Sequence, residues 1–142
     1  MKKEQINEVR KFNRFYAVVL GVLDNRLLET KISLIEGRIL FEINETKENC
    51  IASDIVKRLN IDKSYLSRVL KKLEKNGLIK RQIFTNDNRK FQLCMTDEGR
   101  QLLKEINELT DKNVQAIFGN ISEKEIEDVI NNMISIQKKL EK

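Results

Sequence analysis

The chain has 142 residues, of which 40% are hydrophobic and 35% are charged, with five glycines and no proline. This length and composition are typical of one helix-rich domain with a buried core, and the periodic apolar residues exclude a disordered chain. The absence of histidine excludes Ser–His and Cys–His nucleophile pairs and removes the most common zinc ligand, so no catalytic residue, metal or cofactor is expected.

Membrane insertion and export are not expected either. The longest apolar run, residues 16–22, falls well short of the ~18 residues that a membrane span needs, and the N-terminus has no signal-peptide core. We therefore expect a cytoplasmic protein. Cys50 and Cys94 lack a CxxC spacing, so they are interpreted as small, partly buried side chains, with redox sensing as the less favoured alternative.

The net charge of +5 is concentrated in the middle of the chain. Residues 52–95 carry a net charge of +7, against +1 for residues 1–51 and −3 for residues 96–142. A basic segment between a nearly neutral and an acidic one is typical of a nucleic-acid-binding surface. A solvated charged face is the alternative that charge alone leaves open.

Two helices are predicted in the first third of the chain. Apolar residues recur every three or four positions over residues 5–29, and the apolar face widens at residues 16–23. This width predicts burial on two sides, against the helix's own domain and against a partner. The run Ser33-Leu34-Ile35-Glu36 has the form of a capping box, which predicts a second helix from Ser33 to about Asn44.

The basic segment begins with a pair of short helices. Cys50 and Ile51 can form one short strand before a third helix at residues 52–60, whose inward residues are Ile55, Val56 and Leu59. Asp62 is a suitable N-cap and Gly77 a suitable C′ residue for a fourth helix between them. The apolar side of this helix is formed by Leu66, Val69, Leu70 and Leu73, and the opposite side by Ser64, Arg68, Lys71 and Lys75, flanked by Ser67 and Lys72.

After Gly77 the apolar period changes from 3.6 to 2. Residues 79–84 and 90–95 alternate around the turn-forming residues 85–89, which predicts a β-hairpin. Thr96-Asp97-Glu98 then begins a helix that ends at Gly119-Asn120, and a capping box at Ser122 begins the last helix. The predicted order is four helices, a hairpin and two helices.

Two short helices joined by a tight turn at Asn60-Ile61, and followed by a basic hairpin, form a winged helix-turn-helix. A major groove about 12 Å wide admits one helix, whose exposed side chains then reach the base edges. Arg89, at the tip of the hairpin, is suited to a narrow minor groove, with Asp87 orienting it or capping the turn. The predicted DNA contacts are Lys63, Ser64, Tyr65, Ser67, Arg68, Lys71, Lys72, Lys75, Arg81, Arg89 and Lys90.

Residues 52–79, Asp87-x-Arg89 and Met95-Thr96-Asp97-Glu98-Gly99 resemble the DNA-binding core of the MarR family. The resemblance implies a mainly α protein with a small β-wing, in which residues 1–142 form a single MarR-like domain. Within it, residues 32–96 would form the winged helix-turn-helix, and residues 1–31 and 97–142 the dimerisation helices. It further implies a homodimer that binds a pseudo-palindromic operator, most often as a repressor.

The resemblance also implies a small-molecule effector, bound between the dimerisation and DNA-binding parts. The aromatic candidates for that pocket are Phe12, Phe15, Tyr16 and Phe41, for which burial in the core is the alternative interpretation.

Two other functions are kept as alternatives. Residues 10–23 resemble the start of proteins that fuse a MarR-type half to an acetyltransferase, so the chain can instead be the regulatory module of such a protein. The reading frame beyond Lys142 decides between the two, and nothing in these residues resembles an acetyl-CoA site. A winged helix devoted to protein contacts is the last alternative, and the basic face of the fourth helix argues against it.

Overall fold

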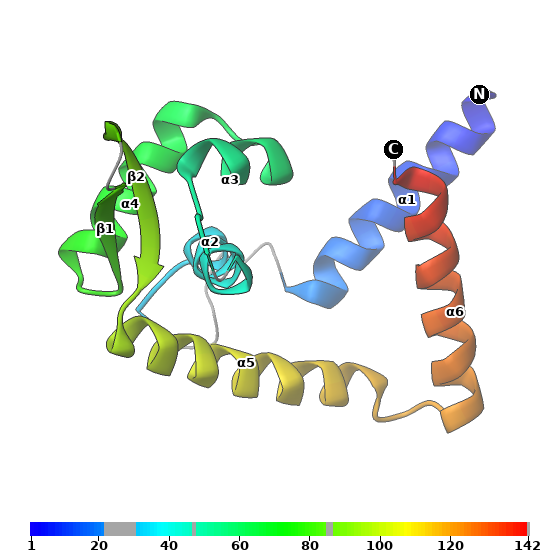
Figure 1. The fold of residues 1–142 in the computed structure, drawn as a ribbon. Coiled ribbons are helices and arrows are strands. Elements are labelled where there is room, and N and C mark those ends of the chain that lie inside the picture. Colours follow the sequence, from blue (N-terminus) through cyan, green and yellow to red (C-terminus); the bar gives the residue numbers. More distant parts are fainter. Residues whose placement is uncertain (22–30, 47, 85–86, 142) are drawn as a thin grey trace. The chain divides into compact units, whose positions relative to one another are not determined.

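The computed structural model describes residues 1–21, 31–46, 48–84 and 87–141, and of residues 84 and 87–90 it describes only the backbone. The elements follow in the predicted order (Figure 1). They are α1 (Lys3–Leu20), α2 (Leu34–Glu45), α3 (Ala52–Leu59), α4 (Lys63–Lys75), β1 (Ile79–Phe84), β2 (Asp87–Met95), α5 (Asp97–Phe118) and α6 (Glu123–Leu140). The predicted fold class, mainly α with a small β-wing, is confirmed.

Helices α2, α4 and α6 begin where the sequence places their caps. The hydroxyl of Ser33 accepts a hydrogen bond from the Glu36 N–H, while the Glu36 carboxylate accepts one from the Ser33 N–H. Ser122 and Glu125 form the same reciprocal pair at α6, and the backbone bond from Ser122 lowers the pKa of the Glu125 carboxyl. Asp62 caps α4 by accepting from the Tyr65 N–H. These boundaries are set by contacts three residues apart, which a sequence displays directly.

Helix α1 ends at Leu20, within the range 5–29 predicted for the first helix. Gly21 adopts a left-handed conformation with φ of +70°, and its N–H bonds to the carbonyls of Ala17 and Val18. Glycine takes this conformation without a Cβ penalty, so the helix ends at Leu20 although the apolar pattern continues. Residues 22–29 of the predicted helix lie outside the described residues.

The hairpin differs from the prediction at two places. Ile79 pairs with Met95 and Ile83 with Phe91, but Phe84 then pairs with Asp87, which is a register shift of three residues. Residues 87–89 therefore belong to β2 and not to the predicted loop, while residues 85–86 lie outside the described part of the chain. The short strand predicted at Cys50-Ile51 is replaced by a single backbone bond from the Leu93 N–H to the Cys50 carbonyl.

The core lies where α2, α3, α4 and the wing meet. All four residues predicted on the apolar side of α4 are buried, and Ile55 of α3 is fully buried. Val56 and Leu59 pack against this core without being fully buried. Within the described ranges, no helix is both long and apolar enough to cross a membrane.

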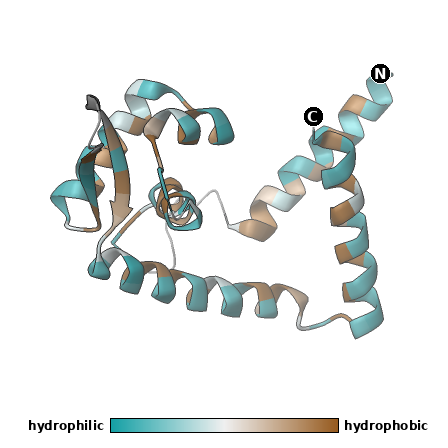
Figure 2. Cartoon of the chain, in the orientation of Figure 1, coloured by the Kyte–Doolittle hydropathy of each residue, from teal (hydrophilic) through white to brown (hydrophobic). Residues whose placement is uncertain are grey.

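The chain divides into two compact units, residues 1–108 and residues 109–142. The second unit contains the end of α5 and all of α6, and none of the residues of α6 is buried. Helix α1, in the first unit, also has no buried residue. Both helices nevertheless contain hydrophobic residues along their length (Figure 2).

Candidate nucleic-acid interface

The helix-turn-helix is formed by α3 and α4. Asn60 ends α3 in a left-handed conformation with φ of +50°, and the Ile61 N–H bonds to the Val56 carbonyl at 3.3 Å. Asparagine tolerates this conformation better than most residues, so the chain reverses within two residues. Asp62 then caps α4. The predicted turn at Asn60-Ile61 is therefore present.

The exposed side of α4 carries hydroxyls and cations. We call this set of residues the α4 basic face: it consists of Ser64, Ser67, Arg68, Lys71 and Lys75, all of which are exposed. The opposite side is held in the core by Leu66 and Leu73, which are 1% and 0% exposed. Because the buried side is fixed, the orientation of the basic face is fixed with it.

Two residues at the start of α4 act together. The guanidinium of Arg68 lies over the ring of Tyr65, 5.9 Å from its centroid, within the range of a cation–π interaction. The backbone N–H of Tyr65 bonds to Asp62 at the N-cap. Within the α4 basic face, Arg68 is the cation for which a contact with an aromatic ring is found.

Two other predicted DNA contacts have carboxylate partners within the protein. The ammonium of Lys72 lies 2.7 Å from Oε1 of Glu36 on α2. Nε of Arg81, on β1, lies 2.8 Å from Oε2 of Glu74, an ion pair whose angle does not make it a hydrogen bond. The Arg81 guanidinium also lies 6.0 Å from the centroid of the Phe91 ring. These pairs fix α4 to α2 on one flank and to the wing on the other.

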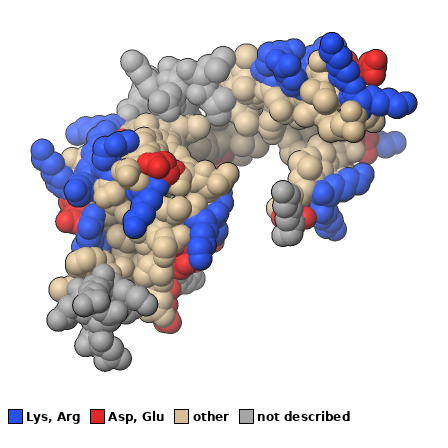
Figure 3. Space-filling view, turned by 90° about the horizontal axis from the view of Figure 1, so that it is seen from above, with Lys and Arg blue, Asp and Glu red and all other residues tan. Residues whose placement is uncertain are grey.

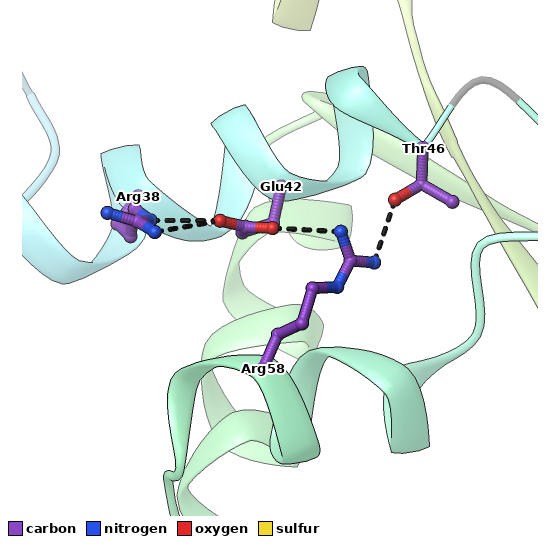
Figure 4. Close-up of polar contacts among 4 residues, drawn as sticks. All are labelled: Arg38, Glu42, Thr46 and Arg58. Atoms are coloured by element: carbon purple, nitrogen blue, oxygen red, sulfur yellow. Dashed lines mark hydrogen bonds and ion pairs between the residues drawn. The ribbon is translucent and has the colours of Figure 1, made fainter. Parts of the chain in front are cut away.

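Sequence reasoning missed a network that joins α2 to α3. The buried carboxylate of Glu42 accepts hydrogen bonds from Arg38 and from Arg58, each at 3.0 Å, and Arg58 also donates to the Thr46 hydroxyl (Figure 4). Only the Arg38–Glu42 pair, with its spacing of four residues, has a local sequence signal. Arg58 therefore donates its hydrogen bonds to other residues of the protein, although it belongs to the basic segment 52–95.

Basic side chains extend beyond α4. Lys63 is exposed at the first position of α4. In Figure 3 the left-hand part of the molecule, which holds α3, α4 and the wing, carries Lys and Arg side chains over much of its visible surface. The side chains of Asp87, Arg89 and Lys90 lie outside what the structure describes, so their predicted roles at the wing stay predictions.

A pocket of about 530 Å³ opens between α3, α4 and the wing. Its wall is largely apolar, with Val56, Leu70 and Phe91 among its residues, and it includes the cations Lys57, Lys63 and Arg81. This combination suits an amphipathic anion. A smaller pocket of about 240 Å³ is lined by residues that include Cys94 and Arg100.

The aromatic residues predicted to line an effector pocket do not line either of these two pockets. Phe12 stacks on Tyr16, with ring centroids 5.6 Å apart, and contacts Phe15 at 6.3 Å on α1. Phe41, on α2, is 40% exposed and lies beneath the Arg38 guanidinium. An effector site at these four residues stays a prediction.

The two cysteines are free and have different environments. Cys50 is completely buried, and this burial raises the pKa of its thiol. Cys94 is half-buried, with Sγ 3.5 Å from Oε1 of Gln82. A buried thiol with a raised pKa is a poor nucleophile, which argues against Cys50 as a redox sensor.

Comparison with known proteins shows which family this part of the chain resembles. Residues 32–91 match the MarR family. The HTH-type transcriptional regulator BilQ of Clostridioides difficile is 31% identical over 94 residues, which cover 66% of this chain and 63% of BilQ. The chain thus matches less than two thirds of the length of this relative.

Solved structures share the fold. A MarR family protein from Bacillus stearothermophilus superposes with a TM-score of 0.82 at 17% identity, covering 100% of this chain and 99% of its own. A putative MarR family regulator from Listeria monocytogenes, complexed with 26mer DNA, gives a TM-score of 0.72 at 23% identity and coverages of 93% and 87%. Bordetella bronchiseptica BpsR, whose DNA binding is regulated by 6-hydroxynicotinic acid, gives 0.70 at 20% identity and coverages of 90% and 91%.

Proposed function

Because residues 32–91 of this chain form a MarR family domain, we propose that the protein is a sequence-specific regulator of transcription that binds double-stranded DNA. We propose repression as its mode of action, in the cytoplasm and without a catalytic role. The observation that carries this proposal is the α4 basic face. Its five side chains are exposed on a helix whose opposite side is buried.

The chemistry of this face fits a major groove. Arginine bonds to guanine through two donors, serine hydroxyls donate or accept, and lysine neutralises phosphates. Arg68, with Ser64 and Ser67 beside it, supplies the first two kinds of contact. Lys71 and Lys75 supply the third, and Lys63, near the N-terminus of α4, lies where phosphate contacts are common.

DNA binding through this face is expected to depend strongly on salt. Each phosphate neutralised on duplex DNA contributes about −0.9 to the slope of log affinity against log salt concentration. With Lys63, Lys71 and Lys75 of each subunit contacting phosphates, we expect a slope of about −5 for a dimer. Fluorescence anisotropy of a duplex selected by the protein from a random-sequence pool measures it. Binding that does not change between low and high salt would contradict the electrostatic part of the proposal.

We also propose that the protein acts as a homodimer through its terminal helices. Helices α1 and α6 have no buried residue, yet each exposes large apolar side chains. The most exposed among them are Val9, Phe12, Phe15 and Val18 on α1, and Ile130, Ile134, Ile136 and Leu140 on α6. Monomeric proteins rarely leave such faces in water.

Sedimentation velocity tests the dimer directly. We expect the protein to sediment at twice the mass of the 16.7 kDa chain at micromolar concentration. A matched pair of variants separates the apolar face from general effects of substitution: Phe15→Glu should lower the sedimentation coefficient, and Arg10→Glu, about 140° from Phe15 around the same helix, should not. A monomer observed for the unaltered protein would rule out this part of the proposal.

A small-molecule effector completes the proposed function. The regulation of BpsR by 6-hydroxynicotinic acid shows that an aromatic carboxylate can control DNA binding on this fold. In the present chain, the pocket between α3, α4 and the wing combines an apolar wall with Lys57, Lys63 and Arg81. Because Lys63 also belongs to the proposed DNA-binding surface, an anion bound there would compete with phosphates.

A further inference from the structure

The carboxylate of Glu36 is buried at the junction between α2 and α4. The residue is 6% exposed, although it carries an ionisable side chain. Its Oε2 accepts a hydrogen bond from the Ser33 N–H at 3.1 Å, and its Oε1 lies 2.7 Å from the ammonium of Lys72. One carboxylate therefore belongs to the N-terminal cap of α2 and also binds Lys72 of α4, which lies 36 residues further along the chain.

The ammonium of Lys72, on α4, balances the negative charge of this carboxylate. A buried charge without a partner is costly, since it has lost its hydration and gained nothing in exchange. If Lys72 turned toward a DNA phosphate, Oε1 of Glu36 would lose its bond. Moving the Lys72 ammonium away from its partner therefore costs more free energy than moving the ammonium of an ordinary surface lysine.

The position of Lys72 on α4 agrees with its ion pair to Glu36 on α2. At 100° per residue, Lys72 is displaced by about 40° from Arg68 toward α2, whereas Lys71 is displaced by about 60° in the other direction. Lys71 is exposed, and no ion pair or hydrogen bond is found for it among the described residues. Two adjacent lysines on one helix therefore have different surroundings.

We propose that Glu36 and Lys72 are positioning residues for DNA recognition: their ion pair sets the orientation of α4, and Lys72 does not neutralise a phosphate. The proposal rests on the proposed function, because α4 must be the helix that reads DNA. It revises the prediction from the sequence that Lys72 is itself a DNA contact. It also gives Glu36, the glutamate of the predicted capping box, a second role that the local pattern does not indicate.

The test compares Glu36→Gln, Lys72→Met and Lys72→Arg with Lys71→Met as the matched control. Affinities are measured over a range of salt for two probes, a duplex selected by the unaltered protein from a random pool and a scrambled duplex of the same length. A positioning residue changes the ratio of the two affinities, whereas a phosphate contact changes both equally and lowers the salt slope by about 0.9 per subunit, or about 1.8 for the dimer. Circular dichroism at the assay temperature confirms that each variant is folded.

We expect Glu36→Gln and Lys72→Met to weaken binding to the selected duplex by about tenfold, because a smaller fraction of molecules holds α4 in the binding orientation. Binding to the scrambled duplex and the salt slope should stay unchanged. A double variant with Glu36→Gln and Lys72→Met should bind the selected duplex no more weakly than either single variant. Lys72→Arg should bind it as tightly as the unaltered protein. Lys71→Met should weaken both duplexes equally.

Three results would overturn the proposal. The first is a fall in salt slope of about 1.8, or about 0.9 from each subunit of the dimer, with Lys72→Met and no effect of Glu36→Gln, which makes Lys72 a phosphate contact. The second is unchanged affinity in both variants, which leaves the pair without a role in recognition. The third is equal loss on both duplexes without rescue by Lys72→Arg. Failure of the unaltered protein to bind any duplex would instead refute the proposed function, and the inference with it.

Discussion

Replacing Arg68 and Lys71 together with alanine should weaken binding to a selected operator duplex by about 10²-fold. Arg68 is expected to contribute most, because one bidentate contact to guanine discriminates against other bases by about 1–3 kcal/mol. Its guanidinium lies over the ring of Tyr65, 5.9 Å from the ring centroid. The Lys71→Ala change should add a loss that is the same for every DNA sequence.

The two contributions can be separated in one set of measurements. Arg68→Ala alone should relax the base preference at one position of the operator, seen as a smaller penalty when that base pair is changed. Lys71→Ala alone should lower the salt slope by about 1.8, or about 0.9 for each subunit of the dimer, and leave base preference intact. A variant with Lys138 and Lys139 changed to alanine serves as the control, since it removes two charges from the last turn of α6. Undiminished binding by the Arg68/Lys71 variant would refute the assignment of α4 as the recognition helix.

The features that the sequence predicted well are those set by neighbours within four residues. The caps at Ser33, Asp62 and Ser122 are each formed with a residue three positions further on. The orientation of α4 follows from the regular spacing of Leu66 and Leu73, both buried. Local geometry determines such contacts, so the same residue types produce them wherever the spacing recurs.

The features that the sequence did not predict depend on residues distant along the chain. Lys72 and Arg81 were grouped with the other cations because their partners, Glu36 and Glu74, lie on neighbouring elements. The contacts of Arg58 with Glu42 and Thr46 were not predicted for the same reason. A count of charges along the chain records the basic excess correctly, but it cannot show which cations are neutralised by a carboxylate from another helix.

The motif Met95-Thr96-Asp97-Glu98-Gly99 makes one contact that the sequence predicted and others that it did not. That Thr96 begins α5 was predicted, and its hydroxyl does accept from the Gly99 N–H at 3.0 Å. The hydroxyl also donates to the Gly77 carbonyl at 2.6 Å, and the Thr96 N–H bonds to the Leu78 carbonyl at 3.2 Å. These two bonds tie the start of α5 to the end of the helix-turn-helix, which no local pattern indicates.

Gly99 should therefore tolerate no side chain. A Cβ at this position would overlap the carbonyl oxygen of Leu78 and lie 3.0 Å from its carbonyl carbon. Since these are backbone atoms held by the bond from Thr96, α5 would have to move away from β1. We expect Gly99→Ala to lower the free energy of unfolding by about 3 kcal/mol, as overpacking of a close contact does, and the melting temperature by roughly 10 °C.

Gly119→Ala is the matched control for this change. Its Cβ would lie 3.3 Å from the Gln115 carbonyl oxygen, with the next atom at 3.6 Å, so a small adjustment suffices and the change should stay within about 0.5 kcal/mol. Thermal unfolding followed by circular dichroism measures both variants. If Gly99→Ala melts with the unaltered protein, α5 can move at no cost, and the close approach of α5 to Leu78 does not hold the helix against the wing. A large loss confined to Gly99→Ala would instead show that this contact stabilises the domain, because the two variants add the same methyl group and differ in what that methyl group meets.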